Sequence, residues 1–129
     1  MKYLDSSALV KLVHPEPATP ALLTWLRAAP GLAVSSALAA VEVTRAIRRS
    51  DPAALPRVPL VLSRTTLVPI DQPVLASAAA LPDPLLRSLD ALHLATAIRL
   101  GSPSLTFVTY DKRLAAAAQQ EGLAIAAPH

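Results

Sequence analysis

Short apolar runs alternate with segments of helical periodicity along the whole chain. Residues 2–4, KYL, predict a strand, and residues 6–13, SSALVKLV, show the three-to-four-residue spacing of apolar side chains that indicates a helix. The same reading predicts further strands at 32–34, 66–68, 105–108 and 123–126, and helices at 18–29, 37–49, 71–80, 88–100 and 111–121. Repeated strand–helix units favour an α/β fold, here a three-layer α/β/α sandwich with a mainly parallel central sheet. No internal repeat or composition break divides the chain, so we expect residues 1–129 to form a single domain.

Capping and breaking residues set the expected ends of these elements. Gly31 ends the second helix, whereas Ser36 and Ser88 are suited to N-cap positions. Three prolines fall within residues 51–59, where we expect a turn and a helix that resumes near Pro59.

The composition narrows the possible functions. With 53% apolar residues the chain is expected to fold, and without cysteine it has no disulfide, thiolate metal site or cysteine nucleophile. Only three glycines occur, so no dinucleotide-binding GxGxxG, P-loop or GxSxG nucleophile elbow can be written. No apolar run is long enough for a membrane span or a signal peptide, and a cytoplasmic protein is expected. The net charge of +3 mildly favours a polyanionic partner.

Four of the nine acidic residues have no simple structural explanation. Asp51 and Asp83 precede prolines and are typical of turns, and Asp71 suits a helix N-cap. Glu16 and Glu121 are expected on the surface. The acids that remain are Asp5, Glu42, Asp90 and Asp111.

Two of these acids follow predicted strands, and the other two lie on predicted helices. Asp5 and Asp111 would line the crevice at the carboxyl ends of a parallel sheet, although each is equally suited to cap the next helix. Glu42 lies mid-helix, either inside the site or in an exposed pair with Arg45. Asp90 opens an apolar helix, where the helix dipole alone would also favour an anion.

If the four carboxylates converge, their mutual repulsion must be relieved. Clustered carboxylates have raised pKa values, and a hard divalent cation removes the repulsion. An all-oxygen ligand set suits Mg²⁺, or Mn²⁺, better than zinc. His93, one turn after Asp90, is alone on its helix and fits a hydrogen-bonded core residue better than a metal ligand.

Four stretches in this order resemble the PIN domain, and in particular the VapC-type toxins of prokaryotic toxin–antitoxin pairs. They are YLDSSALVKL, SALAAVEVTRAI, LRSLDALHLATA and FVTYDKRL, which together extend from Lys2 to Leu114. The resemblance implies an Mg²⁺-dependent endoribonuclease that hydrolyses RNA phosphodiester bonds. Its acidic quartet would fall on Asp5, Glu42, Asp90 and Asp111. The three aspartates would be direct or water-mediated metal ligands, and Glu42 a further ligand or the residue that orients the attacking water.

The resemblance also implies supporting and RNA-binding positions. Ser6 and Thr109 match places where the family often has a hydroxyl that helps to hold the site, and Arg87 matches a frequent basic position. Basic side chains around the crevice would hold RNA phosphates, namely Lys11, Arg45, Arg87, Lys112 and Arg113. Tyr110, beside Asp111, is the best candidate for stacking on a base.

Two departures from the family pattern affect this interpretation. Lys112 and Arg113 stand where some relatives carry a further acid, which leaves the number of metal ions open. The proline-rich stretch Pro52–Pro59 replaces what is usually a cleaner helix, in a region that often takes part in dimer or antitoxin contacts.

The partner implied by the resemblance is a small antitoxin whose arginine-bearing tail enters the acidic site. The apolar segments Ala18–Trp25 and Leu60–Leu62 would supply its groove and a dimer face, giving a homodimer, and a heterotetramer or larger assembly with antitoxin. Two other functions stay open. One is a phosphatase with Asp5 as nucleophile, although Ser7 stands where such enzymes often have a second acid. The other is a non-catalytic, degenerate PIN-like regulatory module.

Overall fold

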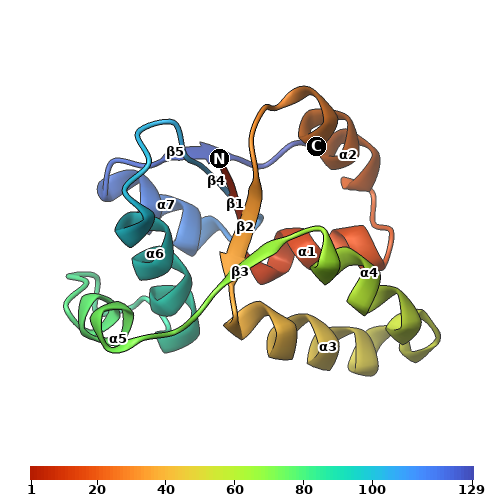
Figure 1. Cartoon of the computed structure of the whole chain (residues 1–129), viewed down its shortest axis with the longest axis horizontal. Helices are drawn as coiled ribbons and strands as arrows, with labels where there is room; N and C mark the ends of the chain where they lie inside the picture. Colours follow the sequence, from red (N-terminus) through yellow and green to blue (C-terminus); the bar gives the residue numbers. More distant parts are fainter.

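The computed structural model describes all 129 residues and contains five short strands in one sheet (Figure 1). The strands are β1 (Lys2–Leu4), β2 (Ala33–Ser36), β3 (Thr66–Val68), β4 (Thr106–Val108) and β5 (Ala124–Ala126). Their order across the sheet is β3-β2-β1-β4-β5, and every neighbouring pair is parallel. The predicted α/β class is therefore confirmed, with a sheet that is parallel throughout.

Helices cover both faces of the sheet and make the three layers (Figure 1). They are α1 (Ser6–Val13), α2 (Thr19–Ala28), α3 (Leu38–Ser50), a 3₁₀ helix (Pro52–Arg57), α4 (Val58–Ser63), α5 (Gln72–Ala79), α6 (Ser88–Leu100) and α7 (Lys112–Gln120). One core cluster joins α1–α4 to the sheet, and a second joins α6 and α7 to the opposite face. No helix has both the length and the apolar character needed to cross a membrane.

The two central strands divide their side chains between these two cores. Leu4 and Val108 face α1–α4, whereas Tyr3 and Phe107 face α6 and α7. Successive residues of a strand point to opposite faces, and a parallel sheet covered on both sides is apolar on both. The rings of Tyr3 and Phe107 stack with centroids 5.1 Å apart and planes 6° from parallel.

The second strand differs from its prediction. It was expected at residues 32–34 but extends to Ser36, and Ser35 and Ser36 are fully buried. Pairing with β3 sets this limit, because Ser35 lies opposite Leu67 and Ser36 opposite Val68. The predicted N-cap role of Ser36 is wrong, because Ala37 takes the cap position of α3 and no side chain caps this end. The Ser36 hydroxyl does accept a hydrogen bond from the amide of Leu38, at 3.1 Å.

Two other local predictions need correction. Ser88 is not the N-cap of α6: it is the first helical residue, Arg87 takes the cap position, and no side chain caps this end. The turn expected over 51–59 is instead a 3₁₀ helix, whereas the helix expected to resume near Pro59 is confirmed as α4. Pro52 and Pro59 occupy first-turn positions, where the missing amide proton costs no helical hydrogen bond.

Candidate active site

Asp5 and Asp111 follow two strands that are neighbours in the sheet. β1 and β4 pair with Leu4 opposite Val108, so both chains leave the sheet at the same edge. The amide of Asp5 donates a hydrogen bond to the carbonyl of Val108 at 3.1 Å. The sheet topology therefore brings these two acids, 106 positions apart in the sequence, to one place.

Asp5 is buried, with 3% of its surface exposed, and both of its carboxylate oxygens accept hydrogen bonds. One carboxylate oxygen accepts from the Ser7 hydroxyl at 2.6 Å and from the Ala8 amide at 3.0 Å, and the other accepts from the Thr109 hydroxyl at 2.6 Å. Burial raises the pKa of Asp5, and these three hydrogen bonds counteract part of that rise. A carboxylate enclosed in this way is poorly placed for direct attack on a phosphorus atom, which counts against the phosphatase alternative.

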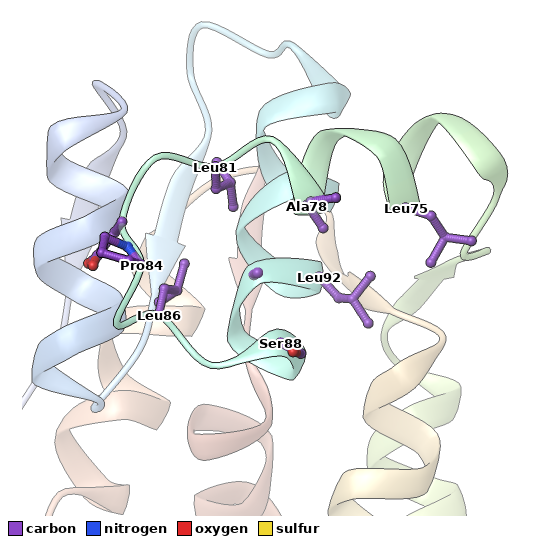
Figure 2. A pocket seen from close by; sticks show the side chains of 10 residues that line it. Leu75, Ala78, Leu81, Pro84, Leu86, Ser88 and Leu92 are labelled. Atoms are coloured by element: carbon purple, nitrogen blue, oxygen red, sulfur yellow. The ribbon is translucent and has the colours of Figure 1, made fainter.

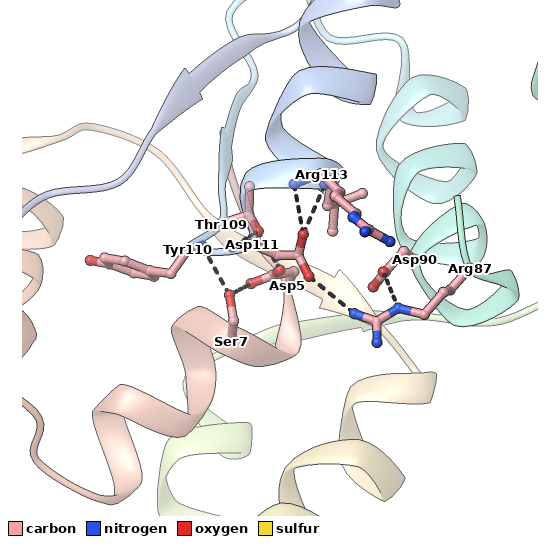
Figure 3. A network of polar contacts seen from close by, with 9 residues as sticks. Asp5, Ser7, Arg87, Asp90, Thr109, Tyr110, Asp111 and Arg113 are labelled. Atoms are coloured by element: carbon pink, nitrogen blue, oxygen red, sulfur yellow. Dashed lines mark hydrogen bonds and ion pairs between the residues drawn. The ribbon is translucent and has the colours of Figure 1, made fainter. Parts of the chain in front are cut away.

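The hydroxyls that hold Asp5 also fix the loop after β4. The Ser7 hydroxyl accepts from the amide of Tyr110 at 3.0 Å, and the Thr109 hydroxyl accepts from the amide of Asp111 at 3.1 Å (Figure 3). Thr109 thus lies where a supporting hydroxyl was expected. Ser7, which was not singled out from the sequence, makes the contact with Asp5. Ser6, which was, lines the neighbouring cavity and makes no side-chain hydrogen bond.

Asp111 has two roles at once. One of its oxygens caps α7 by accepting from the amides of Arg113 and Leu114, at 2.9 and 3.0 Å. The other faces the guanidinium of Arg87, whose Nη2 lies 3.2 Å away. The capping and site interpretations of this residue are therefore compatible, because each uses a different oxygen.

Arg87 bridges Asp111 and Asp90 (Figure 3). Its Nε lies 3.4 Å from an oxygen of Asp90, while Nη2 reaches Asp111. Burial and the negative charge of Asp111 raise the pKa of Asp90, and the Arg87 guanidinium partly opposes the rise. The two acids thus share one positive charge, on a side chain that is 73% exposed.

Glu42 is bound to a buried histidine rather than to Arg45. Its Oε1 lies 2.5 Å from Nε2 of His93, and no ion pair joins it to Arg45. His93 is 1% exposed, and its other ring nitrogen lies 2.8 Å from the hydroxyl of Tyr3. His93 is thus a hydrogen-bonded core residue, as the sequence favoured.

Three of the acids open into one cavity of about 370 Å³. Its polar wall consists of Ser6, Ser7, Glu42, Arg87, Ser88, Asp90 and Asp111. Asp5 lies behind this wall and connects to it through Ser7. A second cavity of about 280 Å³, which contains Lys11 and Glu16, shares Ser6, Ser7 and Glu42 with the first.

A larger cavity of about 440 Å³ lies between α5 and α6 and shares only Ser88 with the acidic cavity (Figure 2). Its lining is mostly apolar, with Leu75, Leu81, Leu86 and Leu92 pointing into it, and it contains none of the four acids. The two polar cavities therefore suit a charged substrate better than this apolar one does.

The expected RNA-binding residues differ in how firmly they are held. Lys11 forms an ion pair with Glu16 at 2.9 Å, and its ammonium lies 4.2 Å from the centroid of the Tyr110 ring. The Tyr110 hydroxyl donates to the carbonyl of Pro128 at 2.8 Å. Lys11 therefore covers one face of Tyr110, which leaves less of that ring for stacking on a base than the sequence suggested.

The other three expected RNA-binding residues are exposed and lie close in the sequence to acids of the site. Lys112 and Arg113 are exposed in the first turn of α7, directly after Asp111. Arg45 is exposed on α3, one turn after Glu42. None of the three is held by an ion pair, so each is available to a polyanion.

The acids are not arranged as a finished metal centre. No group of three or more His, Cys, Asp or Glu side chains is placed to hold a metal ion. In the structure Arg87 bridges Asp90 and Asp111, Glu42 is hydrogen-bonded to His93, and the hydroxyls of Ser7 and Thr109 bind Asp5. The donor chemistry nevertheless fits a hard cation, because the side chains offered are carboxylate oxygens and two of these carboxyls have raised pKa values.

Comparison with known proteins identifies the family. The chain is 50% identical to Ribonuclease VapC35 of Mycobacterium tuberculosis, over 99% of this chain and 97% of that protein. It is 39% identical to Ribonuclease VapC47 of the same species, over 99% of this chain and 97% of the relative.

Solved structures share the fold. A toxin–antitoxin complex from Klebsiella pneumoniae matches with a TM-score of 0.77 and 21% identity, over 100% of this chain and 98% of that one. VapC20 of M. tuberculosis, described as a Sarcin-Ricin loop cleaving toxin, matches with a TM-score of 0.75 and 14% identity, over 91% and 95%. The model of the PIN domain family matches residues 2–120. The chain therefore belongs to the PIN-domain family, in its VapC branch.

Proposed function

We propose that this protein is the toxin of a type II toxin–antitoxin pair and acts in the cytoplasm as a divalent-metal-dependent endoribonuclease. The observation that carries the proposal is the convergence of Glu42, Asp90 and Asp111 on one polar cavity, with Asp5 fixed behind it. Curated relatives up to 50% identical are named ribonucleases, which supports the substrate class. We also propose that the whole chain, 1–129, acts as a single PIN-like domain.

The acidic residues divide into two roles in this proposal. Asp5, Asp90 and Asp111 hold Mg²⁺, or Mn²⁺, directly or through water, and the hydroxyls of Ser7 and Thr109 keep Asp5 in place. The metal would polarise the scissile phosphate and make bound water a stronger acid. Glu42 orients the attacking water from the wall of the same cavity. Ser6 remains a proposed supporting residue at that wall.

The basic residues hold the substrate. Lys112, Arg113 and Arg45 bind RNA phosphates around the cavity. Lys11, held by Glu16 and Tyr110, lines the adjoining cavity, and the bound RNA strand continues into it. Phosphate contacts position a strand without reading its sequence. Arg87 changes partner: it balances the carboxylates before metal and RNA bind and then contacts the phosphate.

A separate cavity, outside the acidic site, supports a protein partner. About 420 Å³ in volume, it lies between α2 and α4 and is lined by Leu23, Leu26, Leu60 and Val61, with Arg27, Arg57 and Arg64 among its polar residues. Leu60 is 63% exposed. An antitoxin segment with apolar and acidic side chains would fit this groove, and its arginine-bearing end would take the place of Arg87 between the carboxylates. Solved complexes with this fold are described as toxin–antitoxin assemblies. We propose the homodimer, and larger assemblies with antitoxin, on the same basis.

The proposal is tested by RNA cleavage under metal control. Purified protein is incubated with total RNA in Mg²⁺, in excess EDTA, and in EDTA followed by restored Mg²⁺. Cleavage should stop on chelation and return when Mg²⁺ is restored. Cleavage that continues in EDTA would exclude metal-dependent chemistry, and metal binding without cleavage of any RNA would favour the degenerate regulatory module.

Replacement of Arg87 should strengthen metal binding, because its guanidinium competes with the cation for Asp90 and Asp111. We expect Arg87→Gln to bind Mn²⁺ roughly two- to fivefold more tightly by titration calorimetry, since an exposed ion pair is worth at most about 1 kcal/mol. Arg99→Gln is the matched control: it removes the same charge from the far end of α6, where Arg99 contacts only Ser77. Weaker binding in Arg87→Gln would show that Arg87 supports the metal site rather than competing for it.

A further inference from the structure

His93 is a polar side chain in the core that the proposed chemistry does not use. It lies on α6 with 1% of its surface exposed, yet both ring nitrogens have partners. Nε2 lies 2.5 Å from Oε1 of Glu42, and Nδ1 lies 2.8 Å from the hydroxyl of Tyr3. The ring meets that of Tyr3 edge-on, with centroids 5.9 Å apart. The histidine thus connects the sheet to the wall of the polar cavity.

We propose that His93 is a positioning residue which, held by Tyr3, fixes the direction of the Glu42 carboxylate. The inference rests on the proposed function, in which Glu42 orients the attacking water. An ionised carboxylate can only accept hydrogen bonds, so Nε2 must carry a hydrogen and donate it to Glu42. In the neutral ring Nδ1 is then an acceptor, and the Tyr3 hydroxyl donates to it.

The arrangement leaves Glu42 with one fixed and one available oxygen. The hydrogen bond to His93 uses Oε1, and no other protein group donates to this side chain. Glu42 also lines both polar cavities, so Oε2 can accept from a water there. A glutamate rotates about three side-chain bonds, and orienting a water requires that this freedom be removed. His93 removes it without touching the substrate.

The first test separates turnover from binding. Steady-state cleavage of an RNA oligonucleotide in Mg²⁺ should show kcat of His93→Leu lowered about tenfold to a hundredfold, as is typical when an outer partner of a site residue is lost. KM should stay nearly constant, because buried His93 does not reach RNA. His93→Gln, whose amide can still donate to Glu42, should restore much of the lost kcat. A purely structural role would not produce this rescue.

Two further variants guard against a folding defect. Leu94→Val alters the next residue of α6, which is also 1% exposed, and should lower Tm with kcat unchanged. Tyr3→Phe removes the hydroxyl but keeps the ring that stacks on Phe107, and should lower kcat less than His93→Leu does. Equal kcat in wild type, His93→Leu and Tyr3→Phe, all folded by circular dichroism, would overturn the inference.

The second test does not depend on activity. Ring ¹⁵N NMR of the wild-type protein should show hydrogen on Nε2 of His93, and Glu42→Gln should shift that signal. An Nε2 without hydrogen, or an Nε2 signal that is unchanged in Glu42→Gln, would overturn the inference even if RNA is cleaved. If the wild type cleaves no RNA at all, the proposed function fails, and the NMR result alone still decides whether His93 holds Glu42.

Discussion

Replacing Asp5 by asparagine is expected to lower the rate of RNA cleavage at least about a hundredfold, the usual scale for losing one electrostatic element of an active site. The change is nearly isosteric, and Oδ1 can still accept from Ser7 and Ala8 as the carboxylate does. At the other position an amide faces Thr109, whose hydroxyl oxygen can accept its hydrogen bond. The variant should therefore keep its fold while it loses the negative charge that a metal would need.

The same variant should be at least as stable as the wild type in metal-free buffer. Burial raises the pKa of Asp5, so the fold favours the protonated form and an ionised Asp5 costs stability at neutral pH. Asparagine carries no charge and avoids that cost. Lower activity combined with an equal or higher Tm in EDTA would show that Asp5 serves function although its charge destabilises the fold.

Activity on RNA with Mg²⁺, and thermal unfolding with EDTA, measure both effects. Asp71→Asn is the matched control, because Asp71 caps α5 through the amide of Val74 at 2.9 Å and lies outside the acidic cavity. Full cleavage by folded Asp5→Asn would remove Asp5 from the mechanism. A large fall in Tm would mean that its hydrogen bonds require an ionised carboxylate.

The strand-end part of the site could be predicted because topology alone decides it. Parallel strands end at the same edge of a sheet, so the sequence could place Asp5 and Asp111 at one edge. That β1 and β4 are neighbours in the sheet, which brings the two acids together, is a finding of the structure. Their capping roles were equally visible from the sequence. The sequence left open whether a residue that caps a helix can also take part in the site. Asp111 does both, because one oxygen caps α7 and the other faces Arg87.

The side-chain partners could not be predicted, because they depend on directions that a pattern does not contain. His93 and Glu42 are 51 positions apart, and their pairing depends on how α6 and α3 face each other across the end of the sheet. The choice of Ser7 over Ser6 depends on the exact residue at which α1 begins, since adjacent helical residues point about 100° apart.

The end of β2 was predicted too early because its last two residues are polar although buried. Ser35 and Ser36 belong to β2 but lack the apolar character used to recognise a strand. Their burial comes from helices packed on both faces of the sheet, which only the tertiary structure supplies.

Truncating Phe107 to alanine should produce the largest loss of stability of the changes considered. Phe107 is fully buried in β4, beside the centre of the sheet, and its ring stacks on Tyr3. Phenylalanine-to-alanine changes in cores cost about 3–5 kcal/mol, which is a large part of the roughly 5–15 kcal/mol that stabilises a typical domain. Because Tyr3 loses its stacking partner, the Tyr3–His93–Glu42 contacts should loosen as well, and RNA cleavage should fall even where the variant is folded.

Urea unfolding measures this loss. All variants are compared at one fixed protein concentration, which keeps any contribution from self-association constant. Leu32→Ala is the matched control: Leu32 directly precedes β2 but is 64% exposed, so its truncation should change the free energy of unfolding by less than about 0.5 kcal/mol. A loss below about 1 kcal/mol for Phe107→Ala would contradict the close packing of this core. A cavity the size of a phenyl ring costs more free energy than that unless the sheet and α6 collapse into it. In that case the Tyr3 ring would move with them, and the ring ¹⁵N signals of His93 should change although stability does not.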